Sequence, residues 1–165
     1  GPAGVTMVVV KKAWVEEKAK KIIPTMLKYK THVDKGSMYN TPPVLPVFVV
    51  GRTLKWIKAM GGLEVIEKNN EMKAKLIYDV IDGCGDFYKG SVKAVEDRSL
   101  MNITWNLQTP ELEDKFIAEA KKLRMLGLKG HRSVGGIRAS TYNSCPVESC
   151  KALAAFMEEF YKANK

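Results

Sequence analysis

Residues 101–107, Met-Asn-Ile-Thr-Trp-Asn-Leu, alternate apolar and polar side chains one for one. This period of two predicts a β-strand with one buried face and one polar face. Thr109-Pro110-Glu111 follows almost at once and places a capping hydroxyl, a proline and an acid where a helix begins. A strand that passes directly into a helix indicates a mixed α/β fold.

Two amphipathic helices are predicted ahead of this strand. Apolar side chains recur at helical spacing over residues 47–57 and again over residues 63–81. Gly61-Gly62 separates the two segments, because glycine readily adopts the left-handed conformation in which helices stop. The residues that define the two apolar faces are Val47, Val50, Leu54 and Ile57 in the first helix, and Ile66, Leu76, Ile77, Val80 and Ile81 in the second.

The remainder of the second half predicts further strands and helices. We expect the helix that starts at Thr109 to run through Leu112, Phe116, Ala120 and Leu123 and to end at Gly127. The elements predicted after it are strands at 128–132 and 137–142 joined by residues 133–136, and a last helix from Pro146 with Cys150, Leu153, Ala154, Met157, Phe160 and Tyr161 on its apolar face. Together these elements make a small α/β sandwich of about 100 residues.

The first 45 residues have a different character. Residues 5–10 are an apolar run that predicts a strand buried on both faces, and residues 13–21 predict a short basic helix. Residues 23–43 show little periodicity and predict a long loop, a kind of segment that usually carries a function. This is too little material for a domain, so we expect the tail of a larger domain whose beginning lies outside the chain.

Composition and charge limit the function classes. The 165 residues include 27 Lys and Arg against 18 Asp and Glu, and the net charge of +9 favours nucleic acid, a membrane surface or phosphorylated small molecules as partners. The longest apolar stretch, residues 44–50, contains a proline and is too short to span a bilayer. Three cysteines and two histidines form no metal-binding pattern and indicate reduced thiols in an intracellular protein.

One stretch gathers cationic side chains around a tight bend, Gly130-His131-Arg132-Ser133-Val134-Gly135-Gly136-Ile137-Arg138. An arginine guanidinium is a planar fork that matches a carboxylate or a phosphate. Arg132 and Arg138, on either side of the Gly-Gly bend, would therefore hold the two ends of a dianionic substrate. The alternative interpretation is a solvated basic hairpin.

A second stretch, Ser37-Met38-Tyr39-Asn40-Thr41-Pro42-Pro43, places small polar donors ahead of a stiff Pro-Pro segment and close to a predicted helix start. Hydroxyl, amide and backbone donors in such a loop would bind a phosphate. The alternative is ordinary turn chemistry with Asn-Thr capping.

These motifs, together with Gly1-Pro2-Ala3-Gly4 before the apolar run, stand in an order and spacing that resemble the C-terminal part of the phosphoserine aminotransferase family. That family consists of pyridoxal-phosphate (PLP) enzymes of the aspartate aminotransferase fold, fold type I. The resemblance covers essentially the whole chain. It implies that residues 1–62 are the C-terminal part of the large PLP-binding domain and that residues 63–165 are the small C-terminal domain.

The resemblance also implies an activity. The family transfers an amino group between L-glutamate and 3-phosphohydroxypyruvate and gives O-phospho-L-serine and 2-oxoglutarate, in serine biosynthesis, as a cytoplasmic homodimer. Carried over by motif, His131 and Arg132 would bind the substrate's phosphate or the side-chain carboxylate of glutamate, and Arg138 would hold the α-carboxylate. Asn40 and Thr41 would donate to the phosphate of the cofactor, across the dimer interface.

One part of the family pattern is missing from the chain. In the family, the lysine that forms the Schiff base lies just before the Gly-Pro-Ala-Gly element, and this chain begins at Gly1. We therefore expect no catalytic residue within the chain and no activity from this polypeptide alone, because the base for the proton shift is absent.

Two other functions agree with parts of the sequence. A basic binding module for nucleic acid or an acidic partner would explain the charge, but no nucleic-acid motif is present and aromatic residues do not interleave with the lysine runs. A related aminotransferase with another substrate would keep the same fold. The resemblance favours a PLP-dependent transaminase with small-molecule substrates and with neither nucleic acid nor a membrane as partner.

Overall fold

The computed structural model describes residues 3–17 and 22–165, with the side chain of residue 17 left out. The chain divides into two compact units, residues 1–60 and residues 61–165. The assignment of residues 1–62 to a large domain and residues 63–165 to a small domain stays a prediction. Each unit is described separately below.

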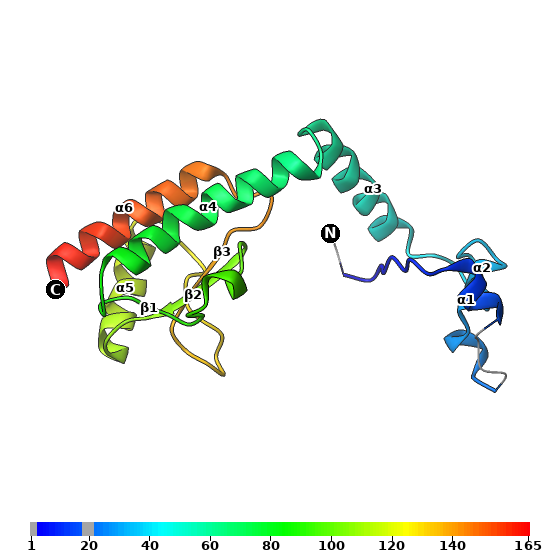
Figure 1. Cartoon of the computed structure of the whole chain (residues 1–165), viewed down its shortest axis with the longest axis horizontal. Helices are drawn as coiled ribbons and strands as arrows, with labels where there is room; N and C mark the ends of the chain where they lie inside the picture. The colour runs from blue at the N-terminus through cyan, green and yellow to red at the C-terminus, as the bar shows by residue number, and fades with distance from the viewer. Residues whose placement is uncertain (1–2, 18–21) are drawn as a thin grey trace. The chain divides into compact units, whose positions relative to one another are not determined.

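A three-stranded antiparallel sheet organises the second unit (Figure 1). Its strands, in spatial order, are β1 (Lys89–Gly90), β2 (Asn102–Asn106) and β3 (Ile137–Ser140). In the register of β2 with β3, Ile103 pairs with Ala139 and Trp105 pairs with Ile137. All four of these side chains are buried, which confirms the one-sided strand that the alternation at 101–107 predicts.

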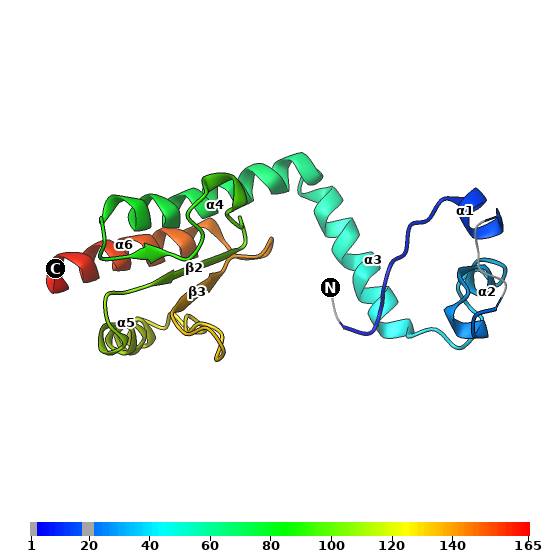
Figure 2. The ribbon, with the colours of Figure 1, turned by 60° about the horizontal axis from the view of Figure 1, so that its bottom comes forward.

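Two long helices, α4 (Leu63–Gly83) and α6 (Val147–Asn164), lie side by side on one face of this sheet (Figures 1 and 2). The third helix, α5 (Pro110–Lys122), follows β2, and the Thr109 hydroxyl caps it by accepting from the Leu112 amide at 3.3 Å. A single 3₁₀ turn, η2 (Val95–Asp97), interrupts the link between β1 and β2.

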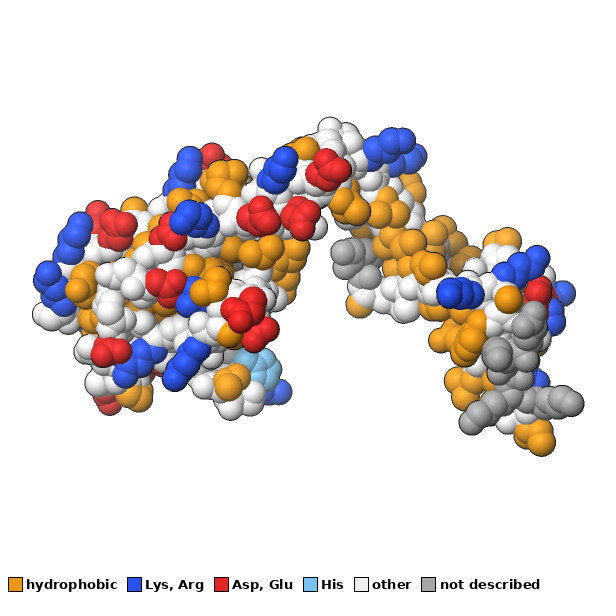
Figure 3. All heavy atoms as spheres, viewed as in Figure 1, with side chains coloured by type: hydrophobic (Ala, Val, Ile, Leu, Met, Phe, Trp, Pro, Cys, Tyr) orange, Lys and Arg blue, Asp and Glu red, His pale blue; other side chains and the backbone are white. Residues whose placement is uncertain are grey.

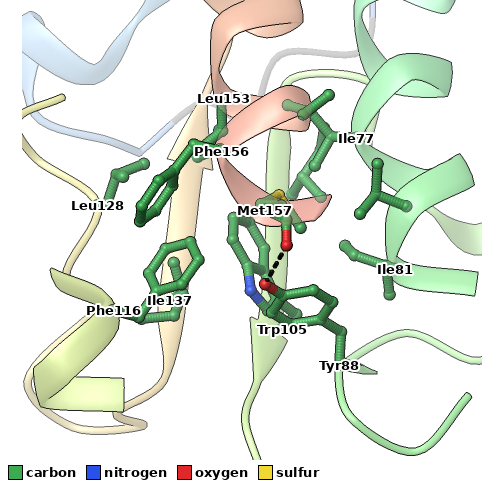
Figure 4. Packing of buried hydrophobic residues seen from close by; sticks show 14 of the residues in the cluster. Ile77, Ile81, Tyr88, Trp105, Phe116, Leu128, Ile137, Leu153, Phe156 and Met157 are labelled. Atoms are coloured by element: carbon green, nitrogen blue, oxygen red, sulfur yellow. Dashed lines mark hydrogen bonds between the residues drawn. The ribbon is translucent and has the colours of Figure 1, made fainter. Parts of the chain in front are cut away.

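The core of this unit lies between the sheet and the helices (Figure 4). Trp105 and Phe116 are fully buried, and their rings meet edge to face with centroids 6.2 Å apart. The Tyr88 hydroxyl donates to the Met157 carbonyl at 2.8 Å, so this buried hydroxyl has a partner. The predicted apolar faces of α4 and α6 are buried in this core, except that Leu76 and Tyr161 are only partly buried and Ile66 is buried outside the cluster.

The structure corrects two predictions in this unit. Helix α5 ends at Lys122 and not at Gly127, because Arg124 adopts a left-handed φ of 64° and the Met125 amide turns back to the Ala120 carbonyl at 3.0 Å. Residues 128–132 form no strand and keep only an isolated bridge between Lys129 and Ile137. The reason is that the chain leaves the sheet at Gly130 to form a loop.

The first unit is mostly helical, and the strand predicted at residues 5–10 is wrong. No strand in the described part of this unit offers it hydrogen-bond partners, and Val9 is 97% exposed. The predicted helix at 13–21 is present as α1 (Lys12–Glu17), and residues 18–21 lie outside the described residues. The predicted loop at 23–43 also holds two short helical turns, η1 (Thr25–Leu27) and α2 (Tyr29–Val33).

The helix predicted over residues 47–57 is confirmed as α3 (Val44–Ala59), which stops ahead of Gly61 and Gly62, both with positive φ. Its apolar side chains are at most half-buried, because none of its residues is fully buried. Figure 3 shows hydrophobic side chains gathered along it. Among the helices that the structure describes, none is long and apolar enough to cross a membrane.

Candidate functional site

Arg138 lies in the middle of β3, on the face of the sheet opposite the buried pair Ile137 and Ala139. Its cross-strand partner is Thr104. The same face carries Ser140, whose hydroxyl donates to the Asn102 side-chain oxygen at 3.1 Å. The helices cover the other face, so the sequence alternation that builds the core also builds a polar surface that carries Arg138 on its β3 edge.

The guanidinium of Arg138 has a buried nitrogen without a partner. Its Nε atom is buried and meets no hydrogen-bond acceptor in the described part of the chain. Buried donors in proteins almost always have a partner, and a ligand acceptor would supply one for this atom. A carboxylate is the acceptor that matches the fork of an arginine.

His131 and Arg132 lie on a loop that begins beside β3 and returns to it. The Gly130 amide donates to the Gly136 carbonyl at 2.8 Å, and the Val134 and Gly135 amides both donate to the His131 carbonyl. These bonds close residues 131–135 into a compact turn. His131 and Arg132 are both exposed, so their polar atoms are open to a ligand.

The ring of His131 is oriented within this loop. Its Nδ1 atom lies 2.7 Å from the Ser133 hydroxyl and accepts from the Ser133 amide at 3.3 Å. An amide can only donate, so the neutral ring carries its proton on Nε2. That proton points away from the Ser133 contact and is available to an anion.

Asn40 and Thr41 lie in the first unit, on the segment that joins α2 to α3. Both are exposed, and the Asn40 amide makes only a weak contact with the Met26 sulfur at 3.6 Å. In the described part of the chain, the Thr41 hydroxyl and the two backbone amides have no protein acceptor within hydrogen-bond distance. This set of neutral donors, with no acid in residues 36–43, suits a phosphate ester.

The structure therefore brings His131, Arg132 and Arg138 together on one loop and its adjoining strand. Asn40 and Thr41 belong to the other unit. Whether each of these residues binds what the resemblance implies stays a prediction.

Sequence reasoning missed two residues that support this region, Asn70 and Lys73 on α4. Lys73 is 1% exposed, and its ammonium donates to the carbonyls of Thr141, Tyr142 and Cys145 at 3.0, 2.8 and 3.3 Å. The Asn70 amide donates to the Asn143 side-chain oxygen at 2.8 Å. Helical spacing from Ile66 and Ile77 places both residues on the buried face, and that spacing was the signal that would have found them.

A cavity of about 480 Å³ lies between residues 123–128 and the start of α6. His131, Arg132 and Arg138 do not line it, and Cys150 does. Burial raises the pKa of Cys150 to about 11, so this thiol is not a nucleophile near neutral pH. Within residues 3–17 and 22–165, no three His, Cys, Asp or Glu side chains gather as metal ligands would.

Comparison with known proteins gives consistent results. The family model described as aminotransferase class-V matches residues 1–153. A phosphoserine aminotransferase of Lysinibacillus sphaericus is 53% identical over the whole chain, and one of Bacillus subtilis is 46% identical. The chain spans 45% of the length of each of these relatives.

Solved structures show the same likeness. A phosphoserine aminotransferase from Bacillus circulans subsp. alkalophilus is 51% identical, with a TM-score of 0.81 over 87% of this chain and 39% of that one. The PLP-bound enzyme from Trichomonas vaginalis is 35% identical, with a TM-score of 0.75 over 84% of this chain and 39% of that one. These likenesses confirm the predicted fold class, a mixed α/β part of a fold-type I transferase.

Proposed function

The chain belongs to the aminotransferase class-V family, and on that premise we propose that it is the C-terminal part of a phosphoserine aminotransferase. The full-length enzyme would transfer an amino group between L-glutamate and 3-phosphohydroxypyruvate and give O-phospho-L-serine and 2-oxoglutarate. The observation that carries this proposal is the buried, unpartnered Nε atom of Arg138 next to the loop that exposes His131 and Arg132. Both substrates carry an anionic group at each end, and the two cationic positions match these groups.

The roles of the cationic residues follow from their surroundings. Arg138 stands on a strand and is half-buried, so it is held in place and suits the α-carboxylate that every amino acid and keto acid substrate shares. His131 and Arg132 are exposed on the loop and suit the distal group, a phosphate or the side-chain carboxylate of glutamate. Fixing both ends of the substrate orients the carbon that carries the amino group.

The residues present fit the phosphate end of PLP. Asn40 and Thr41 offer an amide, a hydroxyl and backbone amides with no acidic neighbour, and in a homodimer they would serve the site of the partner subunit. When bound, PLP supplies the electron sink that lets the amino group move between amino acid and keto acid. The residues of this chain would bind and orient the substrate and the cofactor phosphate. The lysine that forms the Schiff base would come from the rest of the full-length enzyme.

The three cysteines are free thiols, as is usual in a reducing compartment, and we place the enzyme in the cytoplasm as a homodimer. A net charge of +9 fits an enzyme whose cofactor and substrates are all anionic.

The test is amino transfer by the full-length enzyme with Arg132→Ala. Activity with 3-phosphohydroxypyruvate should fall by about a hundredfold, because a phosphate loses more from a missing arginine than a carboxylate does. The half-reaction with L-glutamate should be largely kept. Lys129→Ala, which removes a neighbouring exposed charge, should change neither. Unchanged activity with both substrates in Arg132→Ala would show that this residue is not part of the site. A wild-type enzyme that is inactive with L-glutamate and 3-phosphohydroxypyruvate would contradict the substrate assignment.

A further inference from the structure

The last residue of β2, Asn106, connects the sheet to the first turn of α5. Its side-chain amide donates to Glu113 Oε1 at 3.0 Å, and the backbone amide of Leu107 donates to the same oxygen at 3.2 Å. One carboxylate oxygen thus accepts from two donors and holds the Asn106 amide in one orientation. Bonds to an ionised acceptor are among the stronger hydrogen bonds in proteins.

On its other side, the Asn106 amide lies against the backbone of Gly136. A Cβ at Gly136 would come within 2.6 Å of Asn106 Nδ2 and within 2.8 Å of the Trp105 carbonyl oxygen. Gly136 also has a left-handed φ of 71°. Only a glycine can approach the amide this closely, so Asn106 and Gly136 are matched in shape.

Gly136 is the point at which the loop and the strand of the candidate site meet. Its carbonyl accepts from the Gly130 amide at 2.8 Å, which closes the loop that carries His131 and Arg132. Ile137 follows it in register with Trp105, and Arg138 follows Ile137. A displacement of Gly136 would therefore shift the loop that carries His131 and Arg132 relative to Arg138 on the strand.

We infer that Asn106 and Glu113 are positioning residues, which hold Gly136 and so fix the distance between the two cationic positions of the substrate site. Neither residue is among the groups expected to contact substrate or cofactor. The inference rests on the proposed function for its kinetic consequence. Its structural part, the order of the loop at residues 130–136, stands independently.

The first measurement is amide hydrogen exchange of the full-length enzyme in peptides that span residues 129–137. Asn106→Ala should speed exchange of the Gly130, Val134 and Gly135 amides by about tenfold, because the loop loses the surface that holds it. Glu113→Ala should do the same. Glu113→Gln keeps the accepting oxygen and should restore protection close to that of the wild type. Asp114→Ala, at an exposed neighbouring position on α5, is the matched control and should change nothing.

The second measurement is the split between KM and kcat. Misplaced cations bind the substrate and the transition state more weakly by the same amount. Asn106→Ala should therefore raise KM for both L-glutamate and 3-phosphohydroxypyruvate by about tenfold with kcat little changed. Glu113→Gln should keep KM near the wild-type value. A substitution that merely loosened the fold would instead lower the amount of active enzyme and leave KM unchanged.

The outcomes distinguish a failure of the positioning role from a failure of the proposed function. Unchanged exchange in Asn106→Ala overturns the inference whatever the activity. Faster exchange with unchanged KM for both substrates overturns the positioning role. A wild-type enzyme without activity on this substrate pair rejects the proposed function, whereas the exchange experiment still decides whether Asn106 and Glu113 order the loop.

Discussion

A single buried lysine, Lys73, holds the segment that follows β3. The Lys73 ammonium has three carbonyl acceptors and no carboxylate partner in the described part of the chain. Desolvating an ammonium is costly, and the three carbonyls at 2.8–3.3 Å are what offsets that cost here. The position is therefore sensitive to the loss of the donor as well as to the loss of packing.

Lys73→Met should lower the free energy of unfolding by about 3 kcal/mol, because it leaves buried carbonyls without a donor. Unfolding in urea can be followed by the fluorescence of Trp105 in a background where Trp14 and Trp56 are replaced by phenylalanine. Lys75→Met, which removes an exposed lysine two residues away and its ion pair with Asp79, should cost no more than about 0.5 kcal/mol. Equal effects of the two substitutions would show that the carbonyl contacts of Lys73 do not stabilise the fold.

An exposed ion pair should give the same unit a small dependence on acid. Arg98 donates to both oxygens of Asp82 at 2.6 and 2.8 Å, and these hydrogen bonds hold the pKa of Asp82 below its usual value of 3.8. A carboxyl whose pKa is lowered on folding stabilises the folded state above the unfolded pKa, and this stabilisation is lost as the pH falls through the lowered pKa. Asp82 is half exposed, so solvent limits the effect to less than about 1 kcal/mol.

We therefore expect urea titrations between about pH 6 and pH 2 to show a steeper loss of stability in the wild type than in Asp82→Asn. Asp79→Asn, on the same helix and in an exposed pair with Lys75, is the comparison. Parallel curves for the wild type and Asp82→Asn would contradict the assignment.

At the scale of elements, the sequence patterns correctly predicted those strands and helices that depend on interactions within one segment. The alternation at 101–107, the Thr109 cap and the spacing of apolar residues after Pro146 each act within one segment, and the structure has β2, the start of α5 and α6 in those places. The prediction at residues 5–10 failed because a strand exists only through its partners. The end of α5 was missed because Arg124 adopts a left-handed conformation that arginine rarely takes.

The candidate site shows the same division. Residue types and the Gly-Gly bend drew attention to His131, Arg132 and Arg138 from the sequence alone. The contact of Asn106 with Gly136 and of Lys73 with residues 141–145 joins segments far apart along the chain, and no local pattern contains that information.

The loop that carries His131 depends on a second glycine at its start. A Cβ at Gly130 would lie 1.9 Å from the Gly135 carbonyl oxygen and 2.7 Å from that of Gly136. Gly130→Ala should therefore open the loop, cost about 2 kcal/mol of stability and lower kcat/KM with both proposed substrates. Gly83→Ala is the control, since nothing lies within 4 Å of a Cβ there. Wild-type kinetics and stability in Gly130→Ala would mean that the loop closes in another way.

At the scale of the whole molecule, the two units differ in how far their apolar side chains are buried. Residues 61–165 enclose a core around Trp105 and Phe116. In residues 1–60, α3 has no buried residue, and Leu45 and Phe48 are 72% and 61% exposed. An apolar face of this kind on a helix marks a surface that another protein surface covers.

The chain of 165 residues expressed alone should therefore associate as its concentration rises. Sedimentation velocity over a concentration series would measure this, with binding of a hydrophobic dye as a second readout. Leu45→Lys combined with Phe48→Lys should shift the distribution toward the monomer, because each lysine puts a charge on the apolar face. Lys55→Ala, at an exposed position of the same helix, should not.

A chain that stays monomeric and binds no dye would contradict the expectation, and so would association that the two lysines leave unchanged. The proposed homodimer extends this prediction to the full-length enzyme. If α3 faces protein in the full-length enzyme, the same double substitution should weaken that enzyme's dimer or its fold, whereas Lys55→Ala should leave both intact. Asn40 and Thr41 lie just before α3, so loss of this contact should also weaken PLP binding, which equilibrium dialysis against the cofactor would measure.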